Sequence, residues 1–146
     1  TQLTWTPLAS PLPYAVLPAR HPMADGGETT LAALAGEPYV LFDAADSREY
    51  FYRIFAAQGL SPKVAFRARS LESVRSAVGQ GLGYSLLTMR PPADESYEGH
   101  PLRCVPLEGE IEASEVVIAR PAGRPPSRLF QEFMDFAGGA FPAPPA

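Results

Sequence analysis

The stretch that most constrains the fold of this chain covers residues 63–87, where strand, helix and strand patterns follow one another directly. Lys63–Arg67 has strand composition, and Ser70 is suited to cap the helix that comes next. Tyr84–Leu87 has the composition of a second strand. The apolar side chains between the strands fall on one helical face, at Leu71, Val74, Ala77 and Val78. A strand–helix–strand unit of this kind indicates an α/β fold with parallel strands.

The helix in this stretch ends in a glycine-rich turn. Gly81 suits the left-handed position after a helix, and Gly83 lets the backbone turn tightly or approach a neighbour closely. Gly79–Gly83 closes a helix, so it differs from dinucleotide- and phosphate-binding loops, whose glycines open one. An anionic small molecule would instead find unpaired backbone N–H groups where the helix starts, at Ser70. The stretch is a scaffold for binding and carries no reacting group.

The alternation of helix and strand extends over residues 19–90. A short helix is expected over Leu31–Leu34, capped by Thr29 or Thr30. The apolar run Pro38–Phe42 has the pattern of a strand buried on both faces. The next helix is expected to begin at Asp46, because Glu49 follows at the spacing of a capping box. This order predicts a parallel sheet with helices on its faces and ligand chemistry at the carboxyl ends of its strands.

The two ends of the chain carry further strands and one helix. Strands are expected within residues 1–18 and 102–120, and Ser127 is suited to cap a last helix. Residues 138–146 open with two glycines and show no pattern of a packed element. We therefore expect them to end the last helix and to form a disordered tail.

Composition and charge exclude several classes of function. The 146 residues are enough for one compact domain and part of another. The net charge of −4 leaves no basic surface large enough to hold nucleic acid by itself. The single cysteine, Cys104, excludes an internal disulfide and fits a reducing cytoplasm. No apolar run approaches a membrane span, and His21 and His100 are too far apart in sequence to indicate a metal site or a catalytic triad. We expect no cofactor, no metal ion and no membrane partner.

A set of short motifs in a fixed order narrows the class of protein. The motifs lie, in chain order, at His21–Ala24, Pro38–Val40, Ser47–Phe51, Gly59–Pro62 and Ser70–Gly83. In this order and spacing they resemble the effector-binding domain of LysR-type transcriptional regulators. The resemblance covers residues 5–136, nearly the whole chain.

The resemblance implies a fold like that of type 2 periplasmic binding proteins. Two α/β subdomains would be joined by two crossing strands, with a small-molecule effector in the cleft between them. Residues 19–90 would form one complete subdomain with a parallel-rich sheet. Residues 1–18 would hold a crossover strand and a remnant of the other subdomain, and residues 91–137 would hold the return crossover and its C-terminal part.

The family pattern also includes an N-terminal winged helix-turn-helix, a linker helix and an opening β–α–β portion of the first subdomain, which this sequence does not show. We therefore interpret the chain as a fragment of a longer regulator rather than a standalone module. DNA would be contacted only through the missing N-terminal head. We expect a cytoplasmic homo-oligomer, with a dimer formed through the effector domain and a tetramer in the full-length protein. The strands left from the first subdomain are expected to pair with another chain.

Six residues are candidates for contact with the effector: Phe42, Ser47, Arg48, Ala68, Ser70 and Tyr84. Ser47, the adjacent N–H groups and Arg48 could hold a carboxylate, or they could form an ordinary helix cap with a solvated arginine. Phe42 and Asp43 end a strand at the carboxyl edge where such sheets bind ligands. A core position is the alternative for Phe42. Tyr84 could offer its hydroxyl to a ligand or fill the interface between subdomains.

Two arginines near these candidates leave a similar choice open. Arg67 and Arg69 alternate with Ala68 just before the helix and point to one side of the strand end. As a pair they could meet an anionic ligand. Singly, each is expected to form a salt bridge with an acid such as Glu49 or Glu72.

The function that we favour is the sensing of a small anionic or aromatic metabolite by a bacterial transcription regulator, without catalytic activity. An enzyme that acts on a small acid, built on a similar two-lobed fold, would need a nucleophile–base pair, and the sequence offers none. An extracellular solute receptor would need an export signal, which the sequence lacks, although a trimmed mature chain would not show one.

Overall fold

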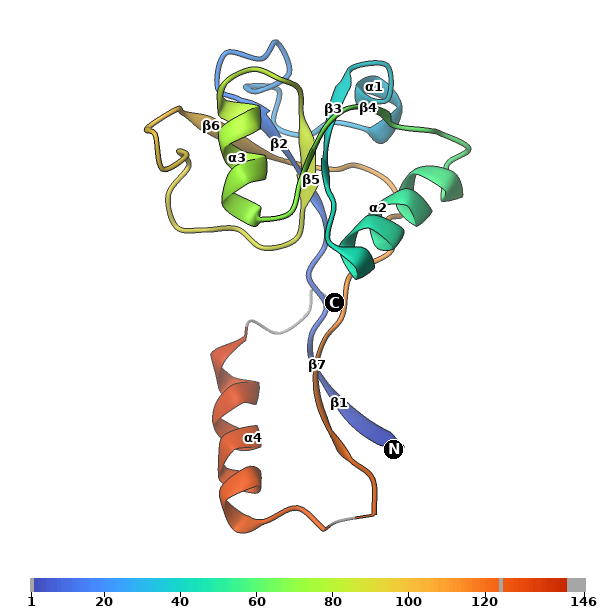
Figure 1. Ribbon diagram of the computed structural model, residues 1–146, viewed down its shortest axis with the longest axis vertical. Coiled ribbons are helices and arrows are strands. Elements are labelled where there is room, and N and C mark those ends of the chain that lie inside the picture. Colours follow the sequence, from blue (N-terminus) through green and yellow to red (C-terminus); the bar gives the residue numbers. More distant parts are fainter. Residues whose placement is uncertain (1, 124, 142–146) are drawn as a thin grey trace. The chain divides into compact units, whose positions relative to one another are not determined.

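The computed structural model describes residues 2–123 and 125–141. The chain divides into two compact units, and each is described by itself. The larger unit is Leu12–Glu112, and the smaller unit combines Thr1–Pro11 with Ala113–Ala146. Figure 1 labels the strands and helices of both units.

The larger unit contains one antiparallel and one parallel group of strands. Strand β2 (Tyr14–Pro18) lies between β5 (Ser85–Leu87) and β6 (Leu102–Pro106) and is antiparallel to both. Strands β3 (Pro38–Phe42) and β4 (Lys63–Ala68) form a parallel pair. The parallel pairing expected from the strand–helix–strand pattern is therefore confirmed.

A parallel bridge between Tyr39 and Tyr84 joins the two groups of strands. The N–H of Tyr84 donates to the carbonyl oxygen of Pro38 at 3.0 Å, and the N–H of Val40 donates to the carbonyl oxygen of Tyr84 at 2.8 Å. The strands of the larger unit thus follow the order β4, β3, β5, β2, β6, with β4 at one edge.

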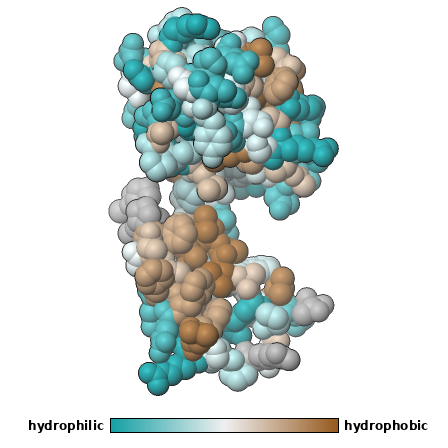
Figure 2. Space-filling view, turned by 60° about the vertical axis from the view of Figure 1, so that its left-hand side comes forward, coloured by the Kyte–Doolittle hydropathy of each residue, from teal (hydrophilic) through white to brown (hydrophobic). Residues whose placement is uncertain are grey.

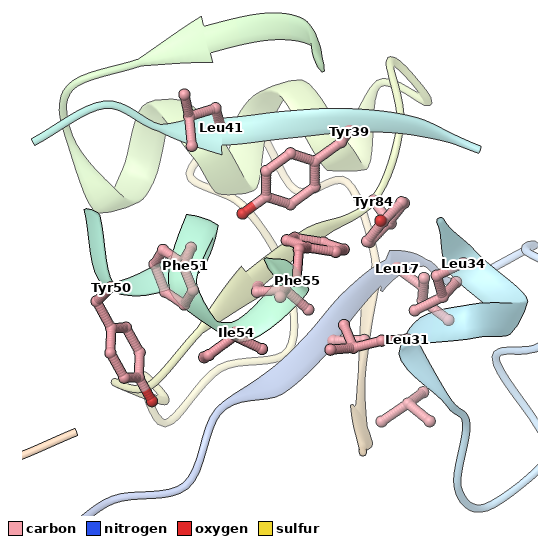
Figure 3. Close-up of a cluster of buried hydrophobic side chains, with 13 residues drawn as sticks. Leu17, Leu31, Leu34, Tyr39, Leu41, Tyr50, Phe51, Ile54, Phe55 and Tyr84 are labelled. Atoms are coloured by element: carbon pink, nitrogen blue, oxygen red, sulfur yellow. The ribbon is translucent and has the colours of Figure 1, made fainter. Parts of the chain in front are cut away.

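Three helices cover this sheet: α1 (Leu31–Leu34), α2 (Ala45–Ala57) and α3 (Leu71–Gly79). The buried side chains of α1 and α2 belong to one apolar cluster (Figure 3). The buried apolar side chains of α3 belong to another. Strand β3 contributes to both clusters, with Tyr39 and Leu41 in the first and Val40 in the second. Because successive side chains of a strand point to opposite faces, β3 is buried on both faces, as predicted.

Two of the three helices begin where the sequence predicts. The hydroxyl of Thr30 accepts the N–H of Ala33 at 3.1 Å, and the hydroxyl of Ser70 accepts the N–H of Ser73 at 3.1 Å. The prediction that Asp46 caps α2 is wrong, because the N-cap residue is Ala44, two residues earlier. Asp46 lies inside the first turn, where its carboxylate is favourable beside the positive end of the helix dipole.

The glycines after α3 serve the two purposes that the sequence suggested. Gly81 has a left-handed φ of 85°, and the N–H of Leu82 donates back to the carbonyl of Ala77 at 3.0 Å, which ends the helix. A Cβ atom at Gly83 would lie 2.2 Å from the carbonyl oxygen of Pro38. Gly83 therefore permits the close backbone approach that joins β3 to β5.

The smaller unit contains two antiparallel strands, β1 (Leu3–Ala9) and β7 (Val116–Pro121), and the helix α4 (Arg128–Ala140). Ser127 caps α4, as predicted, by accepting the N–H of Phe130 at 3.2 Å. The expectation that the glycines at 138–139 end this helix is wrong, because α4 continues to Ala140. A glycine costs a helix only about 1 kcal/mol relative to alanine, which is too little to force an end. The expected disorder of residues 142–146 lies outside the described residues.

The pairing of β2 with β6 sets the extent of the larger unit. Both strands belong to the flanking segments 1–18 and 91–137 of the sequence interpretation. In the structure they lie in the same sheet as β5, inside the larger unit. The larger unit is thus wider than the subdomain expected over residues 19–90, since it also holds the two strands that enter and leave that segment.

Candidate functional site

The carboxyl ends of β3 and β4 meet at one edge of the sheet. Phe42 and Ala68 are paired across these strands, and the N–H of Asp43 donates to the carbonyl oxygen of Ala68 at 2.8 Å. The first turns of α2 and α3 begin immediately after these strand ends. We call this edge, made up of Phe42, Asp43, Ser47, Arg48, Ala68 and Ser70, the strand-end site.

A cluster of opposite charges lies at the strand-end site. Nη1 of Arg48 donates to Oδ1 of Asp43 at 2.7 Å, and Nη1 of Arg67 lies 3.7 Å from Oδ2 of the same carboxylate. The Asp43 side chain is 16% exposed, whereas both arginines are more exposed than this. The hydrogen bond from Arg48 lowers the pKa of Asp43, and the charges of Arg48, Arg67 and Arg69 act in the same direction. The Asp43 carboxylate thus faces several guanidinium groups, while the Asp46 carboxylate lies in the first turn of α2.

The two helix starts at the strand-end site differ in how their backbone groups are satisfied. At α3, the Ser70 hydroxyl accepts the Ser73 N–H and donates to the Ser73 hydroxyl at 2.8 Å. At α2, the N-cap residue is Ala44, whose side chain makes no cap hydrogen bond. The first N–H groups of α2, which include that of Ser47, therefore point away from the helix without an acceptor from the N-cap side chain, and such groups favour an anion.

The structure brings five of the six predicted residues to this site and separates the sixth. Tyr84 is only 1% exposed and lies in the core, with its ring 5.2 Å from that of Tyr39 (Figure 3). The backbone of Tyr84 is hydrogen-bonded to Pro38 and Val40, on either side of Tyr39, and its ring packs against the ring of Tyr39. The described residues bury the Tyr84 side chain in the apolar core, and its contact with an effector stays a prediction.

Arg67 forms a salt bridge with an acidic neighbour, as expected for this residue singly. Its partner is Asp43, whereas Glu72, which the sequence also offered, pairs with Arg75 at 3.2 Å. Sequence reasoning placed Asp43 at the right edge without identifying its partners. The feature that could have identified these partners is the position of Asp43, which directly follows β3 where that strand is in parallel register with the end of β4.

Residues 2–123 and 125–141 contain no group of three or more His, Cys, Asp and Glu side chains that could hold a metal ion. No helix among them is long and apolar enough to cross a membrane.

Comparisons with known proteins define the class. The sequence model of the family described as LysR substrate binding domain matches residues 1–142. The HTH-type transcriptional regulator CysB of Burkholderia cenocepacia is 31% identical over 106 residues, which are 70% of this chain and 32% of that protein. The PA01 protein of Pseudomonas aeruginosa, a putative LysR family transcriptional regulator, superimposes with a TM-score of 0.88 at 33% identity, covering 94% of this chain and 48% of that one. The chain therefore belongs to the LysR substrate-binding domain family.

Solved structures with lower sequence identity to this chain support the assignment of the fold only. The effector-binding domain of QuiR in complex with shikimate has a TM-score of 0.77 at 18% identity, and the BenM effector-binding domain with benzoate has a TM-score of 0.69 at 20% identity. This chain covers 65% and 67% of those two chains. The predicted type 2 periplasmic-binding-protein-like α/β fold is confirmed. The chain spans about half the length of the PA01 protein and about two thirds of the isolated effector-binding domains.

Proposed function

We propose that this chain senses a small anionic metabolite for a bacterial transcription regulator, and that the strand-end site holds the anionic group. The observation that carries the proposal is the set of guanidinium groups around Asp43, next to the uncapped start of α2. A carboxylate placed there would receive hydrogen bonds from Arg48 and from the first N–H groups of α2.

The effectors of distant structural neighbours support an anionic ligand. QuiR is described with shikimate and BenM with benzoate, and each of these ligands carries a carboxylate. The identities are too low to transfer either compound, so the proposal takes only the chemical class from them. An aromatic or alicyclic ring on the carboxylate could rest on Phe42, which is half-buried at the same edge.

Binding would redistribute the contacts of Asp43. An incoming carboxylate would compete with Asp43 for Arg48, while Arg67 would remain to neutralise Asp43. We propose that this exchange is how occupancy of the site is communicated to the start of α2. The chain has no catalytic task in this proposal, because the strand-end site contains no nucleophile paired with a base.

The wider assignments are also proposals. The full-length regulator would be a cytoplasmic homo-oligomer that contacts DNA through a separate winged helix-turn-helix head. Effector binding would shift an equilibrium between states that present this head differently. The smaller unit is proposed to associate with further polypeptide, since its apolar side chains are largely exposed. Light scattering should show a mass that rises with concentration, and a stable monomer at all concentrations would contradict this association.

A thermal-shift screen of small carboxylates tests the proposed ligand class. A carboxylate that raises the melting temperature should lose its effect when it is replaced by its methyl ester or amide. Arg48→Gln should weaken binding by about 10-fold or more, since it removes a charge-assisted hydrogen bond. Ser47→Ala and Ser70→Ala should weaken it less.

Arg53→Gln is the matched control for Arg48→Gln. Arg53 is an exposed arginine of the same unit, and its ion pair with Glu112 at 3.1 Å lies outside the strand-end site. This variant should bind the carboxylate as the wild type does. Equal affinities of the Arg48→Gln and Arg53→Gln variants would refute the proposed site.

A further inference from the structure

A groove on the outer surface of α3 is separate from the strand-end site. It encloses about 520 Å³ and lies between the edge strand β4 and the connection from β5 to β6. Residues from all three segments line it, including Phe66, Ser73, Ser76, Leu82, Tyr97 and Glu98. We call it the α3 groove.

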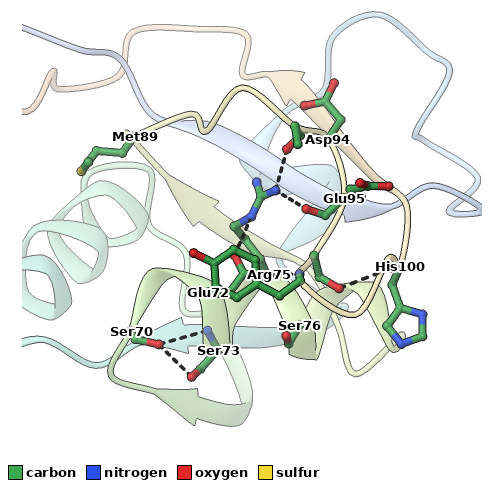
Figure 4. Close-up of polar contacts among 12 residues, drawn as sticks. Ser70, Glu72, Ser73, Arg75, Ser76, Met89, Asp94, Glu95 and His100 are labelled. Atoms are coloured by element: carbon green, nitrogen blue, oxygen red, sulfur yellow. Dashed lines mark hydrogen bonds and ion pairs between the residues drawn. The ribbon is translucent and has the colours of Figure 1, made fainter.

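A buried arginine fixes the wall of the α3 groove that contains Tyr97. Arg75 is 1% exposed, and its Nη2 donates to the carbonyl oxygens of Ala93 at 2.6 Å and Glu95 at 2.5 Å (Figure 4). Its Nε donates to Glu72, whose other carboxylate oxygen accepts the N–H of Tyr97 at 2.6 Å. The connection is thus held against α3 by the hydrogen bonds of a buried arginine and of Glu72, so the Tyr97 wall is a preformed part of the surface.

A β-bulge supplies the opposite wall. Tyr39 pairs with Val64 and Val40 pairs with Phe66, so Ala65 is an extra residue in β4. Without this extra residue, Val64 and Phe66 would face the same side of the sheet. With it, Val64 packs on the cluster of α1 and α2, whereas Phe66 turns to the face covered by α3 and lines the groove. Bulges are common beside binding sites because they redirect one side chain in this way.

The charge of the α3 groove is negative. The Glu98 carboxylate accepts hydrogen bonds from the hydroxyls of Ser76 at 2.5 Å and Ser96 at 2.9 Å, which lower its pKa and keep it ionised. Both hydrogen-bond donors are neutral, and no salt bridge joins Glu98 to a basic side chain in the part of the chain that the structure describes, although His100 nearby also favours the ionised carboxylate. Glu72 also lines the groove, but Arg75 already pairs with it.

Two aromatic rings complete the binding surface. Tyr97 is 91% exposed and Phe66 is about half as exposed, and both border the same groove. The face of an aromatic ring attracts a cation, and it does so most strongly where a neighbouring carboxylate adds to the attraction. Leu82 adds a purely apolar contact beside them.

We propose that the α3 groove is a second ligand site, which binds a small organic cation with an apolar body, such as an ammonium or guanidinium group on an aryl or alkyl stem. The cationic group lies between Glu98 and the ring of Tyr97, and the stem contacts Phe66 and Leu82. The α3 groove and the strand-end site thus select ligands of opposite charge. The cation site does not depend on the proposed effector site.

An NMR titration of the whole chain tests the cation site, with 2-phenylethylammonium as the probe. We expect backbone amide shifts to change at Ser73, Ser76 and Tyr97, with a Kd on the order of 1 mM for so small a ligand. The matched anion 3-phenylpropionate has the same aryl stem and should leave these amides unchanged. Equal binding of the two probes at the groove, or shift changes that avoid it, would overturn the proposal.

Two variants locate the cation within the groove. Glu98→Gln should weaken 2-phenylethylammonium binding about 5-fold, while Glu110→Gln removes an exposed carboxylate elsewhere in the larger unit and should not change it. Identical affinities of these two variants would overturn the proposal. If Glu98→Gln disturbs folding, Tyr97→Ala decides instead, because its exposed ring can be removed without loss of core packing. A Tyr97→Ala variant that binds the probe like the wild type would contradict the proposed site.

Discussion

The two units of this chain use apolar side chains in opposite ways. In the larger unit, most large apolar side chains of α1, α2, α3 and the strands between them are buried in two clusters, and Phe66 in β4 is an exposed exception. In the smaller unit, Trp5 is 66% exposed, Phe133 53% and Phe136 77%. Figure 2 shows the hydrophobic surface that results over the smaller unit. The larger unit buries its own apolar core, whereas the strands and the helix of the smaller unit leave apolar faces exposed.

The difference follows from strand order. In the larger unit, β3 has a neighbour on each side and a helix layer on each face. In the described part of the smaller unit, β1 pairs only with β7, and each strand keeps an open edge. Two strands alone rarely bury enough surface for stability. Four predictions test this comparison.

The largest effect should come from a core substitution that has a matched partner in the smaller unit. Phe55 is fully buried, with its ring 5.4 Å from that of Tyr39, so Phe55→Ala should destabilise the larger unit by about 3–5 kcal/mol. Phe133→Ala removes the same side chain from an exposed position and should change stability by less than about 0.5 kcal/mol. Urea unfolding followed by far-ultraviolet circular dichroism measures both. Similar losses would show that α4 is packed as firmly as α2.

A second pair of substitutions compares glycines. Gly83→Ala would force a Cβ against the Pro38 carbonyl oxygen and should destabilise the larger unit on the order of 2 kcal/mol. Gly138→Ala adds a methyl group to α4 with nothing within 4 Å of it, and it should stabilise that helix by up to about 1 kcal/mol. Helix content and urea midpoints report both changes. A neutral Gly83→Ala variant would contradict the close approach of β3 and β5.

A third pair compares two serine caps. Ser70→Ala removes the acceptor at the start of α3 and should lower the stability of the larger unit by about 1 kcal/mol. Ser127→Ala removes the same kind of cap from α4 and should leave the unfolding of the larger unit unchanged. The single tryptophan, Trp5, lies in the smaller unit, so its fluorescence separates the two transitions. Equal effects of both caps on one shared transition would show that the two units unfold together.

Much of the architecture of the larger unit could be predicted from local sequence. The caps at Thr30 and Ser70 and the turn at Gly81 depend on neighbouring residues, and all three are confirmed. The family could also be recognised, because its motifs occur in a specific order, although each motif by itself is a weak sequence signal. A structural feature could thus be predicted where the residues that interact lie within a few positions of one another in the sequence.

The features that could not be predicted depend on partners far away in sequence. The sequence around Tyr84 is equally compatible with a hydroxyl that faces a ligand and with a ring that fills a core. Only the three-dimensional packing against Tyr39 distinguishes these two positions. The bulge at Ala65 leaves β4 with an ordinary strand composition, so the turn of Phe66 toward α3 has no sequence signal. Asp43 forms ion pairs with both Arg48 and Arg67, and predicting these two pairs requires the register of β3 and β4.

The smallest predicted effect concerns pH at the strand-end site. Arg48 lowers the pKa of Asp43, so the ionised form is favoured in the folded chain, and its contribution is present above the ordinary pKa of 3.8. That contribution should be lost as the pH falls through the lower pKa of the folded state. The wild type should therefore be more stable than Asp43→Asn at neutral pH, with the difference shrinking in acid. Asp25→Asn, at an exposed position, is the control. A difference that stays constant down to pH 2 would contradict the ion pair.

The most direct test of the central claim is to locate a bound effector on the larger unit. The carboxylate with the strongest thermal shift would be titrated into isotope-labelled chain and followed by backbone amide NMR. The account predicts saturable shifts at Asp43, Ser47 and Ser70 that Arg48→Gln weakens and Arg53→Gln does not. Saturable shifts that avoid these three amides, or that persist unchanged in the Arg48→Gln variant, would contradict it.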